Sequence, residues 1–167
     1  PLIVLTAIAV KLESAGPILF RQERLGFNNR RFSIYKFRSM YHADVPVDRT
    51  QQASADDPRV TRVGRFIRRT SIDELPQILN VLRGEMSLVG PRPELPWLVE
   101  QYEPWQWQRL SVTQGITGWW QVNGRSDKPM HLHTEDDIYY VQHYSLLLDV
   151  QILLKTILVV LRGRGAF

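Results

Sequence analysis

The chain is apolar at both ends and mixed in between. At the first end, residues 1–10 contain one polar side chain, a threonine, before Lys11 and Glu13 introduce charge. Ten residues in a helix rise about 15 Å, roughly half the thickness of a hydrocarbon core, so this segment is too short to cross a bilayer. The pattern predicts a helix and leaves open whether protein or membrane covers it.

A second apolar stretch, residues 145–162, holds Asp149 and Lys155 between its ends and is followed by Gly163. Apolar side chains cover most of the circumference of such a helix, and glycine is a common helix stop. Two internal charges make it a poor candidate for spanning a membrane. We expect it to lie in a membrane interface or against the first helix.

Between these ends, two segments have the character of strands. Residues 31–39 alternate between the two faces of a strand, residues 18–20 are a short apolar run, and turn-forming residues 26–29 separate them. This order predicts a β-hairpin. The polar, proline-containing residues 41–58 predict a surface loop or lid.

A short helix is predicted over residues 59–69. It places Val63, Phe66 and Ile67 on one face, and arginines occupy most of the rest.

Another helix is predicted over residues 71–83, where apolar side chains recur at helical spacing and Gly84 ends the pattern. The apolar positions are Leu75, Ile78, Leu79 and Leu82. Ser71 and Glu74 have the spacing of a capping box, but Pro76 removes a backbone donor close to the start. We therefore expect a strained or kinked first turn.

These elements describe an α+β fold that is mostly helical with a small β-hairpin. The 167 residues, 44% of them apolar and 23% charged, suit a single domain with a core. The chain has no cysteine, which excludes disulfides, thiolate metal sites and thiol nucleophiles.

The charge of the chain is unevenly distributed. Residues 1–92 carry 15 basic and 9 acidic side chains, whereas residues 93–167 carry 6 and 8. Seventeen of the 21 basic residues are arginine, whose planar fork binds phosphate or carboxylate through two hydrogen bonds. This bias indicates an anionic partner and leaves nucleic acid, a nucleotide and anionic lipid headgroups open.

Asp73 and Glu74 are adjacent acids at a predicted helix start, shortly after Arg68 and Arg69. The structural interpretation is that both acids stabilise the positive end of the helix. The functional interpretation is that one carboxylate attacks a substrate or holds a metal while arginines bind a phosphate. Downstream, Arg92 is held rigidly between two prolines.

The chain resembles the bacterial sugar transferases, the monotopic polyprenyl-phosphate phosphoglycosyl transferases, over nearly its whole length. The order and spacing of several motifs carry this resemblance, and together they are specific where each alone is weak. The matching segments are residues 16–22, 35–40, 57–64, 71–77, 80–93, 115–118 and 137–141.

The resemblance implies transfer of a sugar-1-phosphate from a nucleoside diphosphate sugar, a UDP-hexose by preference, to undecaprenyl phosphate, with release of UMP. In such enzymes the first acid of the pair, here Asp73, attacks the β-phosphate and forms a covalent phosphosugar intermediate. Glu74 is implied as its partner, and both acids as ligands of Mg²⁺. The residues that match the family's basic positions around the phosphates are Lys36, Arg68 and Arg92.

Further residues are expected to support this site: Asp137, Gln77 and Arg125. The family pattern has a proline where this chain has Gln114, which predicts a less rigid loop with the chemistry intact. Membrane lipids are expected partners and nucleic acid is not, while a homodimer is left open.

The resemblance also implies a domain organisation. Residues 1–14 match the second half of a re-entrant membrane helix, so we expect its first half, and further membrane segments, to precede Pro1. Residues 15–167, including the apolar helix 145–162, match a single catalytic domain on the cytoplasmic face of the bacterial inner membrane.

Two other classes of function remain as alternatives. A basic nucleic-acid-binding domain would explain the arginine bias but neither the apolar ends nor the acid pair. A non-catalytic membrane scaffold would explain the apolar ends, but its function would survive replacement of Asp73.

Overall fold

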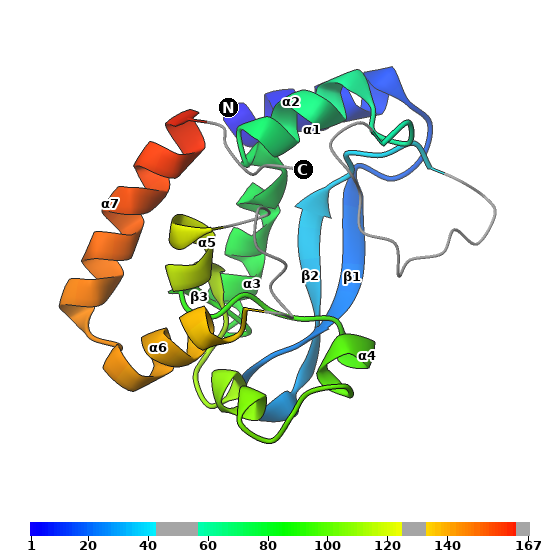
Figure 1. Ribbon diagram of the computed structural model, residues 1–167. Helices are drawn as coiled ribbons and strands as arrows, with labels where there is room; N and C mark the ends of the chain where they lie inside the picture. The colour runs from blue at the N-terminus through cyan, green and yellow to red at the C-terminus, as the bar shows by residue number, and fades with distance from the viewer. Residues whose placement is uncertain (43–56, 125–132, 163–167) are drawn as a thin grey trace.

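The computed structural model describes residues 1–42, 57–124 and 133–162 (Figure 1). Its elements, with η for a 3₁₀ helix, are α1 (Leu2–Glu13), β1 (Leu19–Leu25), η1 (Phe27–Asn29), β2 (Arg31–Phe37), α2 (Arg62–Arg69), η2 (Ile72–Gln77), α3 (Ile78–Leu82), β3 (Ser87–Val89), α4 (Pro96–Val99), η3 (Gln106–Leu110), β4 (Gly115–Thr117), α5 (Trp119–Asn123), α6 (Glu135–His143) and α7 (Leu146–Arg162). The fold is α+β and mostly helical, as the sequence predicts.

The predicted hairpin is confirmed. Strands β1 and β2 are antiparallel, from the pair Leu19 and Phe37 to the pair Leu25 and Arg31 at the turn. β1 is longer than predicted, because its polar residues pair with β2 along the whole strand. Two asparagines with positive φ, Asn28 and Asn29, form the turn, and asparagine tolerates this left-handed backbone better than most residues.

A second pair of strands was not predicted. β3 and β4 are parallel, three residues each, and pair Ser87 with Gly115 and Val89 with Thr117. The backbones approach so closely that a Cβ on Gly115 would lie 2.1 Å from the amide nitrogen of Gly90. Only glycine fits such a contact, and the strands are too short to show a clear period in the sequence.

Among the described residues, buried side chains form three small core clusters. One joins α1, β2 and α2, a second joins β3, α6 and α7, and a third joins the hairpin turn to α4 and η3. Their buried members are Val10, Phe37 and Ile67; Val89, Tyr140, Leu148 and Ile152; and Leu25, Val99 and Leu110. Figure 1 shows the elements that contribute to these clusters, with the hairpin on the right, α7 on the left and α3 between them.

The predicted helix 71–83 is instead a 3₁₀ helix, η2, followed by the short α3. Ser71 has φ 57° and its side chain makes no capping hydrogen bond, so the predicted capping box is wrong. The expected strain of the first turn is confirmed by this left-handed residue. Pro76 lies inside η2, where the backbone adopts i→i+3 bonds.

Most apolar side chains of α3 are exposed. Ile78, Leu79 and Leu82 are 40%, 44% and 78% exposed, whereas the polar Gln77 and Asn80 are 2% and 0% exposed. Asn80 accepts a hydrogen bond from the Tyr35 amide (3.2 Å) and donates to the Ser33 carbonyl (2.8 Å), which ties α3 to the edge of β2. Polar side chains therefore face the protein, and apolar ones face outward.

Helix α2 is only partly buried. Ile67 is 2% exposed and lies in the core, whereas Phe66, on the same predicted face, is 61% exposed. The helix begins after Thr61, whose side chain accepts a hydrogen bond from the Gly64 amide (2.8 Å), and Glu13 of α1 accepts bonds from the first two amides of α2. These caps orient α2 against α1.

Helix α7 packs on β3, β4 and α5 rather than on the first helix. Leu148 and Ile152 are buried, but most of its other apolar side chains are exposed. No helix of the described segments is long and apolar enough to cross a membrane.

Candidate active site

A compact cluster of acidic and basic side chains lies between β2, η2 and the segment after β3. The Lys36 amine donates a hydrogen bond to Glu74 Oε1 at 2.7 Å, and Arg92 Nη2 donates to the same oxygen at 2.6 Å. These three residues are 38 and 18 positions apart in the sequence. The fold thus assembles the two predicted phosphate-binding cations around one acid of the pair.

Glu74 is held as a charged carboxylate. Burial alone would raise its pKa, but Arg92 and Lys36, through charge and hydrogen bonds, hold it below the ordinary value. In turn, Glu74 raises the pKa of Arg92. The glutamate therefore fixes the positions of two cations at one place.

Asp73 has a different environment. It is 8% exposed, and no residue in the described segments donates a hydrogen bond to its carboxylate or forms an ion pair with it. Burial raises its pKa to about 6, with Glu74 acting in the same direction and Lys36, Arg68 and Arg92 in opposition. A buried acid without a partner beside several cations is typical of a reactive group rather than of a helix cap.

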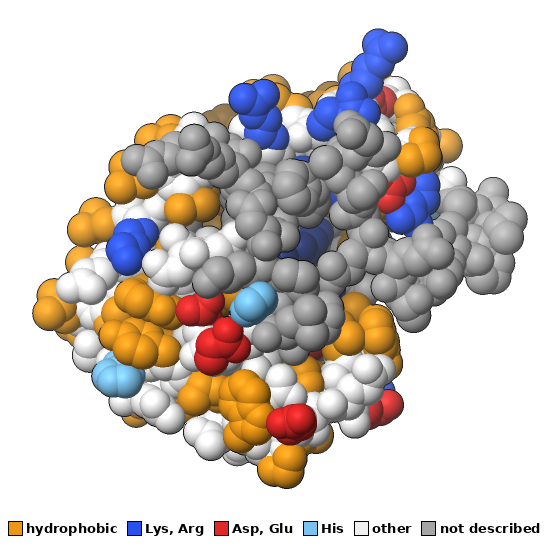
Figure 2. All heavy atoms as spheres, viewed as in Figure 1, with side chains coloured by type: hydrophobic (Ala, Val, Ile, Leu, Met, Phe, Trp, Pro, Cys, Tyr) orange, Lys and Arg blue, Asp and Glu red, His pale blue; other side chains and the backbone are white. Residues whose placement is uncertain are grey.

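Arg68 approaches Asp73 from α2, close enough for its charge to lower the pKa of that acid. Its Nε donates a hydrogen bond to Ser39 Oγ at 2.7 Å, which fixes the side chain at the end of β2. Figure 2 shows basic side chains gathered over the end of the molecule where α1 and α2 lie.

Arg92 belongs to a backbone segment, residues 90–94, that is fixed at successive positions. The Gly90 amide donates to the Thr117 carbonyl (2.9 Å), the Gly115 amide to the Pro91 carbonyl (2.9 Å), and the Leu25 amide to the Glu94 carbonyl (2.9 Å). The rigid presentation expected from the flanking prolines is therefore reinforced by bonds to β4 and to β1.

The three residues predicted to support the site differ in their position relative to the cluster. Gln77 is buried one turn after Asp73. Asp137 is fully buried, and its carboxylate accepts a hydrogen bond from Arg109 Nη2 at 2.5 Å, so it reaches the cluster only through Arg109. Arg125 lies outside the described residues.

Sequence reasoning missed Arg109, which is fully buried. It is a single basic residue after a tryptophan-rich stretch, with no motif to indicate burial. Gln114 also differs from expectation. Its side-chain amide is buried and donates to the carbonyls of Arg109 (3.1 Å) and Val112 (3.0 Å), so hydrogen bonds hold the loop that was expected to be less rigid.

The acid pair fits a magnesium ion in part. Both close contacts of Glu74 use Oε1, and Oε2 has one long contact, 3.4 Å from Arg92 Nη1, so Oε2 and the Asp73 carboxylate remain for a cation. The described part of the chain has no group of three or more acidic or histidine residues that could hold a metal alone. Mg²⁺ is commonly held by one or two carboxylates together with substrate phosphates.

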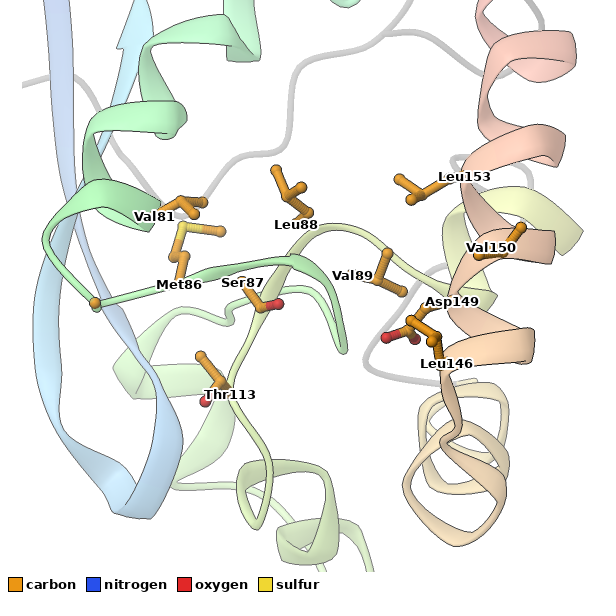
Figure 3. Close-up of a pocket in the computed structure, with 11 residues that line it drawn as sticks. Val81, Met86, Ser87, Leu88, Val89, Thr113, Leu146, Asp149, Val150 and Leu153 are labelled. Carbon is orange, nitrogen blue, oxygen red and sulfur yellow. The ribbon is translucent and has the colours of Figure 1, made fainter.

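A hollow of about 520 Å³ lies elsewhere, between α3, β3 and the start of α7 (Figure 3). Its lining is mostly apolar, with Leu88, Val89 and Leu153 among the residues that face it, and Asp149 is its one charged residue within the described segments. Without a cation, the hollow does not suit a diphosphate. Among the described segments, the cluster around Asp73 is therefore the candidate site for phosphate chemistry.

A family described as bacterial sugar transferase matches residues 1–163. Relatives include an undecaprenyl-phosphate glucose phosphotransferase of Komagataeibacter xylinus, 49% identical over all of this chain and 34% of the relative. A UDP-N-acetylgalactosamine-undecaprenyl-phosphate N-acetylgalactosaminephosphotransferase of Aeromonas hydrophila is 47% identical over 99% of this chain and 40% of the relative. A UDP-glucose:undecaprenyl-phosphate glucose-1-phosphate transferase of Xanthomonas campestris pv. campestris is 45% identical over 100% of this chain and 36% of the relative.

The chain belongs to the bacterial sugar transferase family. It spans between 34% and 40% of the length of these three relatives. The match runs from α1 through α7 and includes every residue of the cluster described above.

Proposed function

We propose that the protein containing this chain transfers a sugar-1-phosphate from a UDP-hexose to undecaprenyl phosphate and releases UMP, as the first membrane step in assembling an exopolysaccharide or related glycan. The observation that carries the proposal is the contrast within the acid pair: Glu74 is bound by two cations, whereas the buried Asp73 has no partner in the described segments. The names of the three relatives, two UDP-sugar transferases and a glucose phosphotransferase that all act on undecaprenyl phosphate, support the substrates.

The chemistry follows from the position of Asp73. Its ionised carboxylate attacks the β-phosphorus of the donor, an O–P bond forms, and the bond between that phosphorus and the bridging oxygen breaks. UMP leaves with the bridging oxygen. An oxygen of undecaprenyl phosphate then attacks the same phosphorus and releases the Asp73 carboxylate, so that the lipid carries the sugar through a diphosphate.

The surrounding residues supply electrostatic stabilisation and positioning, which phosphoryl transfer needs more than acid–base catalysis. Lys36, Arg68 and Arg92 bind the phosphates, and Glu74 keeps Lys36 and Arg92 in place. When bound between Asp73 and Glu74, Mg²⁺ would neutralise part of the charge of the diphosphate.

We further propose that the protein lies on the cytoplasmic face of the bacterial inner membrane, with α1 as part of a re-entrant membrane segment. Exposed apolar side chains on α1, α3 and α7 support contact with lipid, where the acceptor resides. Examples are Leu5, Leu82 and Leu154, which are 65%, 78% and 60% exposed.

The test uses the full-length protein in vesicles with Mg²⁺, undecaprenyl phosphate and a panel of UDP-hexoses, and it measures UMP release. We expect release with at least one donor and none from Asp73→Asn. Glu23→Gln, which alters an exposed ion pair with Arg31, is the matched control and should match the wild-type rate. No release with any donor would contradict the proposal, and a phosphosugar adduct on a residue other than Asp73 would contradict the role of that residue.

The same preparation tests the two alternatives. Retention on DNA or RNA that weakens with salt, without turnover, would favour a nucleic-acid-binding domain. A cellular function that survives Asp73→Asn would favour a scaffold.

A further inference from the structure

Arg109 contacts the backbone of the segment that carries Arg92. Its Nη2 donates a hydrogen bond to the backbone carbonyl of Arg92 at 2.7 Å. The Arg92 guanidinium, in turn, donates to Glu74 at 2.6 Å. One buried arginine thus holds the backbone of the arginine that meets the acid pair.

Arg109 is itself fixed by a set of buried acceptors. Its side chain and that of Asp137 are both 0% exposed, and they are 2.5 Å apart. Glu94 Oε2 lies 3.9 Å from Nη1, and the hydroxyl group of Tyr102 accepts a hydrogen bond from Nη1. Burial lowers the pKa of Arg109, but Asp137, Tyr102 and Glu94 together raise it above its ordinary value, so the guanidinium stays charged.

This arrangement is costly if its purpose is stability alone. Buried ion pairs lose so much hydration that apolar residues of similar volume often stabilise a protein as well or better. What the planar guanidinium provides is geometry, because its several donors have fixed directions and can bind a carbonyl, a carboxylate and a hydroxyl group at once. The donors of a lysine all lie on one nitrogen, so they cannot reach the same three acceptors in this geometry.

We propose that Arg109, with Asp137 as its counter-ion, is a positioning residue that fixes the Arg92 carbonyl and thereby directs the Arg92 guanidinium at the donor diphosphate. The proposal rests on the proposed function for the identity of the donor. It assigns Asp137 an indirect role, because its carboxylate acts through Arg109 and Arg92 rather than on the reacting phosphate.

The test is a double-mutant cycle in the full-length, vesicle-bound protein with Arg92→Lys, Arg109→Lys and the combination. Arg109→Lys should raise KM for the UDP-sugar about fivefold or more. Since both substitutions act on the same contact, KM of the double variant should be no more than about threefold higher than KM of Arg92→Lys alone. Arg31→Lys, in an exposed ion pair with Glu23, is the matched control and should leave KM and kcat unchanged.

A structural role alone predicts a different result. In that case Arg109→Lys lowers the thermal midpoint but leaves KM unchanged, both alone and when combined with Arg92→Lys; this outcome would overturn the proposal. If Arg109→Lys does not fold, Asp137→Asn takes its place in the cycle, because it leaves the bond to the Arg92 carbonyl but removes the main counter-ion of Arg109. A smaller rise in KM, again sub-multiplicative with Arg92→Lys, is then expected, and an unchanged KM overturns the proposal.

A second measurement separates this inference from the proposed function. Binding of inorganic diphosphate is measured by calorimetry on the same proteins. If the wild type releases no UMP, the proposed function fails and diphosphate affinity decides the inference. Weaker diphosphate binding in both single variants, without a further loss in the double variant, supports the inference. Binding that depends on Arg92 but not on Arg109 overturns the inference alone, and a wild type that neither turns over nor binds diphosphate overturns both.

Discussion

At the scale of single residues, the adjacent acids of the site have opposite electrostatic surroundings. Glu74 lies between Lys36 and Arg92, and its charge is balanced in place. Asp73 is nearly as buried as a core residue and lacks such partners in the described segments. Its protonation state should therefore be visible both in the rate and in the stability of the protein.

The rate should depend on pH through Asp73. The burial that raises its pKa to about 6 keeps the proposed nucleophile protonated in more acidic solution. We expect kcat/KM to rise about tenfold per pH unit below pH 6 and to level off above it, since kcat/KM reports groups of the free enzyme. Initial rates between pH 4.5 and about 8 test this, with circular dichroism at each pH as the control for folding. A flat profile between pH 5 and about 7 would contradict it.

Stability should respond in the opposite sense. An acid whose pKa rises from 3.8 to about 6 on folding favours the native state while protonated, and this contribution is lost as pH rises from about 4 through about 6. We expect Asp73→Asn to be more stable than wild type above pH 6 by up to about 3 kcal/mol, from about 1.4 kcal/mol per pKa unit. Urea unfolding at several pH values measures the difference. An advantage of the variant that is the same at pH 4 and about 7 would show that Asp73 is not the cause.

At the scale of elements, the site depends on how closely α2 approaches the end of β2. A Cβ on Gly64 would lie 1.9 Å from the carbonyl oxygen of Ser39, the residue whose hydroxyl group holds Arg68. No residue larger than glycine fits at position 64 unless α2 moves away from Ser39. A backbone contact therefore places the helix together with Arg68, the arginine proposed to bind phosphate.

Gly64→Ala should lower the free energy of unfolding by about 1–3 kcal/mol, because α2 must shift away from Ser39. It should also reduce kcat/KM, since Arg68 moves with the helix. Gly84→Ala is the control: φ is +72° there and no atom lies within 4 Å, so about 1 kcal/mol of backbone strain is expected with unchanged activity. Urea unfolding and initial rates measure both variants, and equal activity of the two would contradict the argument.

The η2–α3 segment shows what local patterning can and cannot predict. Helical spacing of the apolar residues was recognised, and the strain near Pro76 was expected. The side that faces the protein cannot be predicted from a capping box and an apolar stripe, because both are local signals. Asn80, which is fully buried against β2, bonds to the Tyr35 amide and the Ser33 carbonyl, 45 and 47 residues away.

At the scale of the whole molecule, apolar surface remains uncovered on several helices. On α7, Leu148 and Ile152 alone are buried among its leucines and isoleucines, while Leu154 and Leu158 are 60% and 53% exposed. An exposed apolar area of this extent is typical of contact with a membrane or another protein. The proposed membrane location makes lipid the expected partner.

The double substitution Leu154→Glu/Leu158→Glu should weaken binding to vesicles about tenfold or more, because two apolar side chains no longer enter the lipid. The free energy of unfolding should stay within about 0.5 kcal/mol, since both positions are exposed. Co-sedimentation with vesicles containing anionic lipid measures binding. Phe27→Glu, at the hairpin turn and 41% exposed, is the control. If vesicle binding persists while a dimer in detergent is lost, a second copy of the chain covers this surface instead.

The sequence by itself determined the class of fold, the hairpin, the long apolar helix and, through the order of its motifs, the family. These follow from local backbone preferences and from residue types that can be recognised one segment at a time. Only the tertiary structure decided that Lys36 and Arg92 converge on Glu74, that Asp73 is left without a partner in the described segments, and that Asp137 pairs with Arg109. Burial and charge pairing arise between segments far apart in the chain, so the electrostatics of the acid pair depend on contacts that neither residue type nor spacing records.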